Sequence, residues 1–152
     1  MRDKDNLFDS TEVRVTDQFQ ADLAAMIAHR TTDLSIAESA AVGALPSGAA
    51  LLIVRRGSDL GARFLLDQDI TTAGRNPKAD IFLDDVTVSR SHAEFVRRGT
   101  KFSVVDKGSL NGTYCNCKRI ESEIALQDGD EVQVGKYRFT FFASRFDIAK
   151  GA

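Results

Sequence analysis

Three short segments of this 152-residue chain gather side chains that can hold a phosphate group, namely Arg75, Ser89, Arg90, Ser109 and Asn111. A guanidinium donates two parallel hydrogen bonds to an oxyanion, and hydroxyl, amide and backbone N–H groups add further donors. No carboxylate–histidine–nucleophile set and no metal-ligand set can be assembled around them from the sequence. We therefore predict a protein that binds a phosphate without cleaving it, with no catalytic residue, no metal and no cofactor.

Arg75 and its neighbour in the motif region, His92, have simpler interpretations when each is taken alone. Arg75 is typical of an arginine at a strand end that forms a surface ion pair, for example with Asp80 or Asp85. His92 could act as a general base, but the sequence places no nucleophile beside it, and a structural hydrogen bond is the better interpretation. The three segments favour phosphate binding only when they are considered together.

The segments must be positioned by the elements around them. From residue 49 onward, short apolar runs alternate with turn residues, and no long helix interrupts them. Apolar and polar residues alternate over Glu131–Val134, which indicates a strand with one buried face. This pattern predicts an all-β sandwich of ten or eleven strands. The expected strands are 50–54, 63–66, 70–73, 81–83, 92–96, 102–105, 113–115, 123–126, 131–134 and 137–142.

The first 48 residues differ in composition, and we expect them to form a flexible regulatory tail. Residues 1–15 are polar and predict disorder. Apolar residues at helical spacing within 17–29 predict a short amphipathic segment that either docks on the domain or binds a partner. Residues 30–48 are rich in Ala, Ser, Thr and Gly and predict a linker. The expected division of the chain is 1–48, 49–143 and a C-terminal tail over 144–152.

Charge and composition exclude several classes of function. The net charge is −2, with 4 basic and 8 acidic side chains in residues 1–48 and 16 and 14 in residues 49–152. A nearly neutral domain argues against general binding of nucleic acid. No signal-peptide core and no run of 18 apolar residues occurs, so we expect a cytoplasmic protein without a membrane partner. Cys115 and Cys117 predict two reduced thiols, because one Cys-x-Cys pair makes a poor zinc site.

Together the motifs resemble the forkhead-associated (FHA) family of phosphothreonine-binding β-sandwiches. The resemblance covers roughly residues 49–143 and rests on Gly74-Arg75, Ser89-x-x-His92-Ala93 and Asn111-Gly112-Thr113. It implies that Arg75 and Ser89 bind the phosphate, with Arg90 as a charged contact nearby. Ser109 and Asn111 would lie in the loop that holds the phosphopeptide. The residues that it implies to be structural are Gly74, His92, Gly112 and Thr113.

A closer resemblance connects the chain to the small actinobacterial regulators that inhibit 2-oxoglutarate dehydrogenase, also called glycogen accumulation regulators. It rests on Gly61-x-Arg63-Phe64-Leu65-Leu66-Asp67, on residues 80–90 and on the segment that begins at Thr16. It implies that a Ser/Thr kinase phosphorylates Thr16 and that the phosphorylated tail binds the protein's own FHA domain. It also implies that the E1-type component of 2-oxoglutarate dehydrogenase and glutamate-metabolising enzymes are partners of the unphosphorylated form.

The sequence departs from these regulators at three positions. Val15 stands where they carry another threonine, Gln20 replaces an arginine, and Ser91 replaces an arginine at the rim of the expected site. The first departure puts a second phosphorylation site in doubt. The alternative function is an adaptor that recruits phosphothreonine proteins in trans, with a tail that only leads into the domain.

Overall fold

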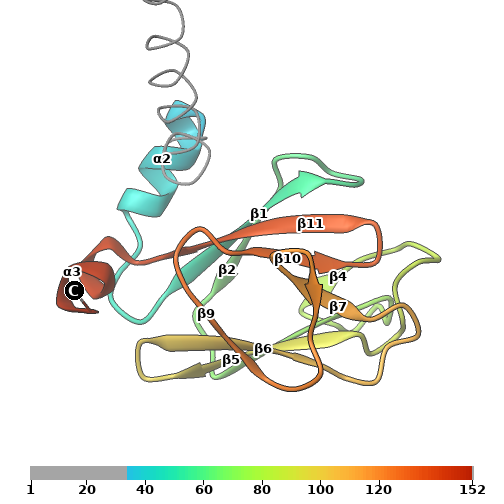
Figure 1. Ribbon diagram of the computed structural model, residues 1–152. Coiled ribbons are helices and arrows are strands. Elements are labelled where there is room, and N and C mark those ends of the chain that lie inside the picture. The colour runs from blue at the N-terminus through green and yellow to red at the C-terminus, as the bar shows by residue number, and fades with distance from the viewer. Residues whose placement is uncertain (1–33, 152) are drawn as a thin grey trace, which may run out of the picture. The chain divides into compact units, whose positions relative to one another are not determined.

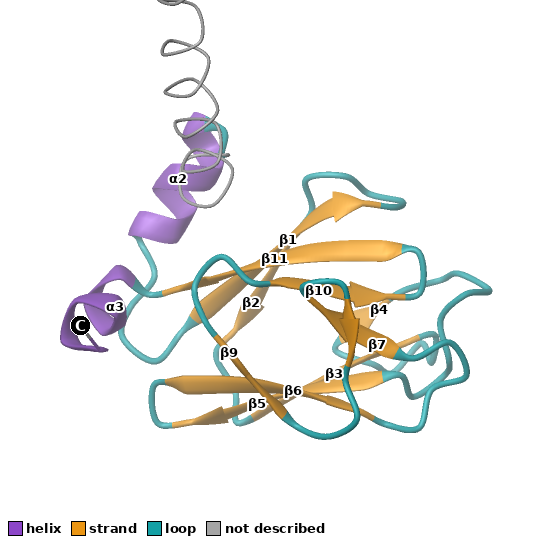
Figure 2. Ribbon diagram, viewed as in Figure 1, coloured by secondary structure: helices purple, strands orange, loops and turns teal. Residues whose placement is uncertain are grey.

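Two packed sheets with eleven strands make up the domain in the computed structural model, which describes residues 34–151 (Figures 1 and 2). One sheet has the order β2-β1-β11-β10-β7-β8 and the other the order β4-β3-β5-β6-β9. The all-β sandwich predicted from the sequence is confirmed. The strands are β1 (Ala50–Arg56), β2 (Arg63–Leu66), β3 (Ile70–Gly74), β4 (Ile81–Phe82), β5 (Ala93–Arg98), β6 (Lys101–Asp106), β7 (Thr113–Cys115), β8 (Lys118–Arg119), β9 (Ile124–Leu126), β10 (Glu131–Val134) and β11 (Tyr137–Ala143).

The core lies between the two sheets and is built from alternate residues of the strands. In β10, Val132 and Val134 are fully buried, while Glu131 and Gln133, which alternate with them, are only half-buried, as the alternation predicted. Aromatic rings fill much of the space, and the rings of Phe102 and Phe141 pack 5.5 Å apart across the two sheets. This packing fixes the strand ends, so the loops that they carry start from a rigid frame.

Among the described strands, β8 is the one that the sequence pattern did not predict. It pairs with β7 through Cys115 and Lys118, and the two residues between them, Asn116 and Cys117, both have positive φ, 50° and 71°. Two consecutive residues in this region form the turn that suits a tight hairpin. Lys118–Arg119 gives no strand signal in the sequence, because two residues are too few to show an alternating pattern.

Within the expected linker, residues Ile36–Gly43 form the helix α2. The helix begins with a capping box: Ser35 Oγ accepts from the Glu38 N–H at 3.1 Å, and Glu38 Oε1 accepts from the Ser35 N–H at 3.2 Å. The alanines that suggested a linker are also the best helix formers. Residues 1–33 lie outside the described part of the chain, and so do Thr16 and the amphipathic segment predicted over 17–29.

The segments before β1 and after β11 are joined by hydrogen bonds. Ser144 Oγ donates to the Leu45 carbonyl at 3.0 Å. The Asp147 carboxylate accepts from Ser47 Oγ at 2.5 Å and from the Gly48 N–H at 2.8 Å. Asp147 belongs to the helix α3 (Arg145–Gly151), within the expected C-terminal tail. The domain boundaries at 48 and 143 stay predictions. Neither α2 nor α3 has the length and hydropathy needed to cross a bilayer.

Candidate functional site

The loops that carry the predicted site residues meet at one end of the sandwich, around the loop from β4 to β5. Ser89 lies in this loop, where its carbonyl accepts from the Arg75 N–H at 2.9 Å and its Oγ accepts from the Leu110 N–H at 3.0 Å. Asn111 Nδ2 donates to the Thr87 carbonyl at 2.9 Å. The structure therefore brings Arg75, Ser89 and Asn111 together, although they are far apart in the sequence.

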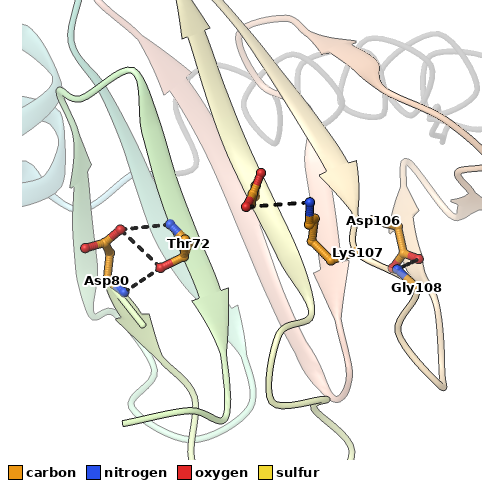
Figure 3. A network of polar contacts seen from close by, with 6 residues as sticks. Thr72, Asp80, Asp106, Lys107 and Gly108 are labelled. Atoms are coloured by element: carbon orange, nitrogen blue, oxygen red, sulfur yellow. Dashed lines mark hydrogen bonds and ion pairs between the residues drawn. The ribbon is translucent and has the colours of Figure 1, made fainter. Parts of the chain in front are cut away.

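The Arg75 side chain is exposed but held in a defined orientation. Its Nε donates to the Val88 carbonyl at 3.0 Å, and its two Nη groups have no protein partner among the described residues. The surface ion pair considered from the sequence is absent there, because Asp85 pairs with Lys136 and Asp80 accepts from Thr72 N and Oγ1 (Figure 3). A guanidinium anchored at Nε presents its outer edge to an oxyanion.

His92 braces the loop that presents Ser89, which is the structural role predicted for it. The ring is fully buried; Nδ1 accepts from the Ser89 N–H at 3.0 Å and Nε2 lies 2.9 Å from the Gly112 carbonyl. A neutral ring with its proton on Nε2 satisfies both partners. Burial lowers the pKa of His92, although the Gly112 carbonyl and the charge of Asp106 act in the opposite direction. With both nitrogens engaged, His92 is not placed to act as a general base.

Two glycines allow backbone contacts that a side chain would prevent. A Cβ on Gly74 would lie 2.1 Å from the Arg90 carbonyl oxygen, so only glycine lets the end of β3 approach the loop after Ser89. Gly112 has φ of +83°, and a Cβ there would lie 2.7 Å from Arg119 Nε. Both predicted structural roles therefore have a steric reason.

Asp106, at the end of β6, organises the next loop and was missed in the sequence. Its carboxylate accepts from Ser109 Oγ at 2.5 Å, from Thr113 Oγ1 at 2.8 Å and from the Gly108 N–H at 3.0 Å (Figure 3 shows Asp106 with Gly108). Burial would raise the pKa of Asp106, but these hydrogen bonds outweigh it and lower the pKa. The signal was Asp-Lys-Gly-Ser, because an aspartate two residues before a glycine favours such a turn.

This network changes the expected use of Ser109. The residue lies in the predicted loop, but its side chain is buried and its hydroxyl donates to Asp106. Ser109 therefore shapes the loop, and Thr113, which is also buried, has the same partner. Arg90, in contrast, is exposed beside Ser89, and within residues 34–151 only its carbonyl is engaged, by the Asn76 N–H at 3.1 Å. We call Arg75, Ser89, Arg90 and Asn111 the cradle.

A second carboxylate, Asp85, fastens the loop from β4 to β5 to the turn between β10 and β11. Asp85 Oδ2 accepts from the Thr87 N–H at 2.8 Å and from the Thr87 hydroxyl, while Oδ1 lies 2.8 Å from Lys136 Nζ. The hydrogen bond from Lys136, followed by those from Thr87, lowers the pKa of Asp85 to about 2. Thr87 Oγ1 also accepts from the Lys136 N–H at 2.9 Å. Sequence reasoning missed this network, since its residues are about fifty positions apart.

Beside the cradle lies an open cleft of about 550 Å³. It reaches from the loops onto the outer face of β7 and β10, where Tyr114 and Gln133 are paired in register. The residues that line it are Thr87, Asn111, Gly112, Tyr114, Cys117, Gln133, Gly135, Lys136 and Arg138. The cleft gives an extended ligand room to continue past Asn111.

Comparison with known proteins identifies the family of the chain and agrees with its fold. The family model described as FHA domain matches residues 71–135. The chain is 52% identical over 140 residues to the glycogen accumulation regulator GarA of Mycobacterium tuberculosis, covering 91% of this chain and 85% of that protein. It is 52% identical over 132 residues to the oxoglutarate dehydrogenase inhibitor of Corynebacterium glutamicum, covering 87% and 90%.

A solved structure is also similar. It comes from a structural and functional analysis of phosphothreonine-dependent FHA domain interactions, with a TM-score of 0.57 and 30% identity. The match covers 62% of this chain and 95% of that one. The chain therefore belongs to the family of small FHA-domain proteins that includes the GarA regulators and the oxoglutarate dehydrogenase inhibitors.

Proposed function

We propose that the cradle binds phosphothreonine. Arg75 carries this proposal, because its guanidinium is oriented by Val88 and leaves two Nη groups for a phosphate. Ser89 supplies a neutral hydroxyl beside it, Arg90 a second positive charge, and Asn111 an amide oxygen for the ligand backbone. A phosphothreonine offers about −1.5 to −2 charges and three acceptor oxygens, which matches these donors. The role of the site is binding, and we propose no reaction for it.

We propose further that the unphosphorylated protein inhibits enzymes that use 2-oxoglutarate, in the cytoplasm. The names of relatives with 52% identity support this, since one is called a glycogen accumulation regulator and another an oxoglutarate dehydrogenase inhibitor. The partners would be the E1-type component of 2-oxoglutarate dehydrogenase and glutamate-metabolising enzymes. A Ser/Thr kinase that phosphorylates Thr16 would end the inhibition, because the phosphorylated tail then becomes a ligand for the protein's own cradle.

The length of the tail suits such a switch. After Thr16, 32 residues lead up to and include Gly48, and α2 converts eight of them into about 12 Å of helix. Its reach stays on the order of 30 Å, comparable with the size of the domain. A ligand tethered in this way has an effective concentration of order mM. This concentration is roughly a thousand times a micromolar dissociation constant, so the tethered ligand outcompetes a free partner of micromolar affinity.

The test compares the wild-type chain with Thr16→Ala and Arg75→Ala, before and after kinase treatment. NMR amide shifts at Gly74, Ser89 and Asn111 should follow phosphorylation of the wild type and vanish in both variants. Inhibition of oxoglutarate dehydrogenase should be lost on phosphorylation in the wild type and be retained by Thr16→Ala. Phosphorylated Thr16 without shifts in the cradle would contradict closure of the tail.

The same variants separate the switch from the adaptor. An adaptor with an unaltered cradle binds phosphothreonine peptides in trans equally well with or without Thr16. If Thr16→Ala leaves both peptide binding and kinase control unchanged, the adaptor is the correct function. Loss of peptide binding in Arg75→Ala is expected in either case, so this variant tests the cradle alone.

A further inference from the structure

Two apolar side chains stand at the tips of the loops that form the cradle. Val86 is 91% exposed and Leu110 is 85% exposed; among the described large apolar side chains only Ile36, in the helix α2, is as exposed, at 92%, and Leu60 follows at 69%. Single exposed apolar residues are common on protein surfaces, so exposure alone decides nothing. We call Val86 and Leu110 the apolar rim.

The backbone holds both residues of the apolar rim in place. Val86 sits in a turn closed on Asp85, which accepts from the Thr87 N–H at 2.8 Å through Oδ2 and from the Val88 N–H at 3.1 Å through its carbonyl. The Leu110 N–H donates to Ser89 Oγ at 3.0 Å. A side chain displayed on a fixed backbone loses little conformational entropy on binding, which makes it an effective anchor.

The two loops also support one another. Asn111 Nδ2 donates to the Thr87 carbonyl at 2.9 Å, and Val86 and Leu110 are the chain neighbours of these two residues. The apolar rim therefore belongs to one connected surface and not to two independent loops. This surface also carries Arg75 and Arg90, and neither guanidinium forms an ion pair within residues 34–148.

We infer that the apolar rim anchors a folded partner that carries no phosphate, at an apolar recess rimmed by carboxylates. The inference rests on the proposed function, because this partner is the inhibited enzyme. Projections on two separate loops suit a concave folded surface, and Arg75 and Arg90 attract carboxylates at its edge. A carboxylate carries less charge than a phosphate, so binding without phosphate draws on the apolar contacts of Val86 and Leu110.

The test is the double variant Val86→Ser with Leu110→Ser in the full chain. One probe is the purified E1-type component of oxoglutarate dehydrogenase from Corynebacterium glutamicum, and the other is a peptide of residues 10–22 phosphorylated on Thr16. The enzyme should bind about 100-fold more weakly, or about tenfold per side chain, which corresponds to ~1.4 kcal/mol each. The phosphopeptide should lose less than about threefold, since its affinity comes mainly from phosphate contacts.

Leu60→Ser is the matched control, because Leu60 is exposed in the loop between β1 and β2 and belongs to neither the cradle nor the rim. It should leave both affinities unchanged. The inference is overturned if the double variant binds the enzyme within threefold of the wild type, or if both ligands weaken in parallel. If the wild-type chain itself does not bind the enzyme, the proposed function fails and the inference fails with it.

Discussion

The interior of the site depends on one neutral histidine. His92 joins the Ser89 N–H to the Gly112 carbonyl in a place that water does not reach, so its proton must stay on Nε2. A second proton on the ring would turn Nδ1 into a donor and break its bond with Ser89. The position of Ser89, which we propose to contact the phosphate, is thus controlled by the protonation of His92.

We therefore expect stability to fall in mild acid. The pKa of His92 lies below its ordinary value of 6.5 because of burial. Above pH 6.5 both the folded and the unfolded chain hold a neutral ring, and the full stability is present. Below it the unfolded chain takes up the proton first, so the free energy of unfolding decreases as pH falls. Urea titrations between pH 7.5 and 5 measure this slope.

His92→Gln should remove most of that slope and lower stability by about 2–4 kcal/mol, because two buried polar groups lose a well-placed partner. The other histidine, His29, provides the control, and His29→Gln should keep the slope of the wild type. If the slope persists in His92→Gln, another group is responsible for it.

Gly74 provides a steric prediction. In Gly74→Ala the new Cβ would meet the Arg90 carbonyl oxygen at 2.1 Å, so the end of β3 must move away from the loop. We expect a loss of about 1–3 kcal/mol in stability and at least tenfold weaker phosphopeptide binding. Calorimetry and peptide titration measure the two effects.

Gly43→Ala is the matched change, because nothing lies within 4 Å of a Cβ at the end of α2. It should leave peptide binding intact and be neutral or stabilising by up to about 1 kcal/mol. Equal peptide affinity in the two variants would show that the close approach at Gly74 is irrelevant to binding.

At the scale of elements, the loops act as a unit because carboxylates at their bases connect them. Asp106 shapes the loop between β6 and β7, and Asp85 fastens the loop between β4 and β5 to the turn between β10 and β11. The strands fix where each loop begins and ends, and the Asp106 and Asp85 side chains fix the conformation of the loops between them.

Asp85→Asn should loosen this connection. The ion pair with Lys136 is lost at neutral pH, and amide exchange at Lys136, whose N–H donates to Thr87 Oγ1, should accelerate several-fold. In the wild type the same loosening should begin in acid, as the pH falls from 3.8 towards the Asp85 pKa of about 2. Glu123→Gln, which removes a partner of Arg98 in another exposed ion pair, should leave that amide unchanged.

The strands of the fold could be predicted from the sequence more completely than the contacts within the loops. The strands followed from alternation over Glu131–Val134 and similar runs, because burial of one face determines which residues are apolar. The cradle residues followed from residue type and spacing. The hydrogen bond from the Ser109 hydroxyl to Asp106 could not be predicted, since the sequence does not distinguish a serine that bonds its own loop from one that faces a ligand. The helix α2 was missed because alanine is common in helices and linkers alike.

At the scale of the whole molecule, the proposed functions would place two kinds of partner on a single surface. The cradle offers charged donors, and the apolar rim beside it offers contacts that need no phosphate. Residues 1–48 carry a net charge of −4 and residues 49–152 a net charge of +2, so the tail and the domain attract one another weakly before any phosphate is added. Phosphorylation of Thr16 would strengthen an attraction that is already present.

The hydrogen bonds of Asp147 with Ser47 and Gly48 make the domain suitable for circular permutation. They place the beginning and the end of the sandwich beside one another. The joined ends lie beyond the last residue of β11, whereas the turn at Lys136, beside the cradle, precedes its first residue. A short peptide could therefore connect the two ends, and new ends could be opened in the loop at Leu60. Such a circular permutant would keep the cradle intact while the tail that we propose to be regulatory was attached at a different edge of the domain.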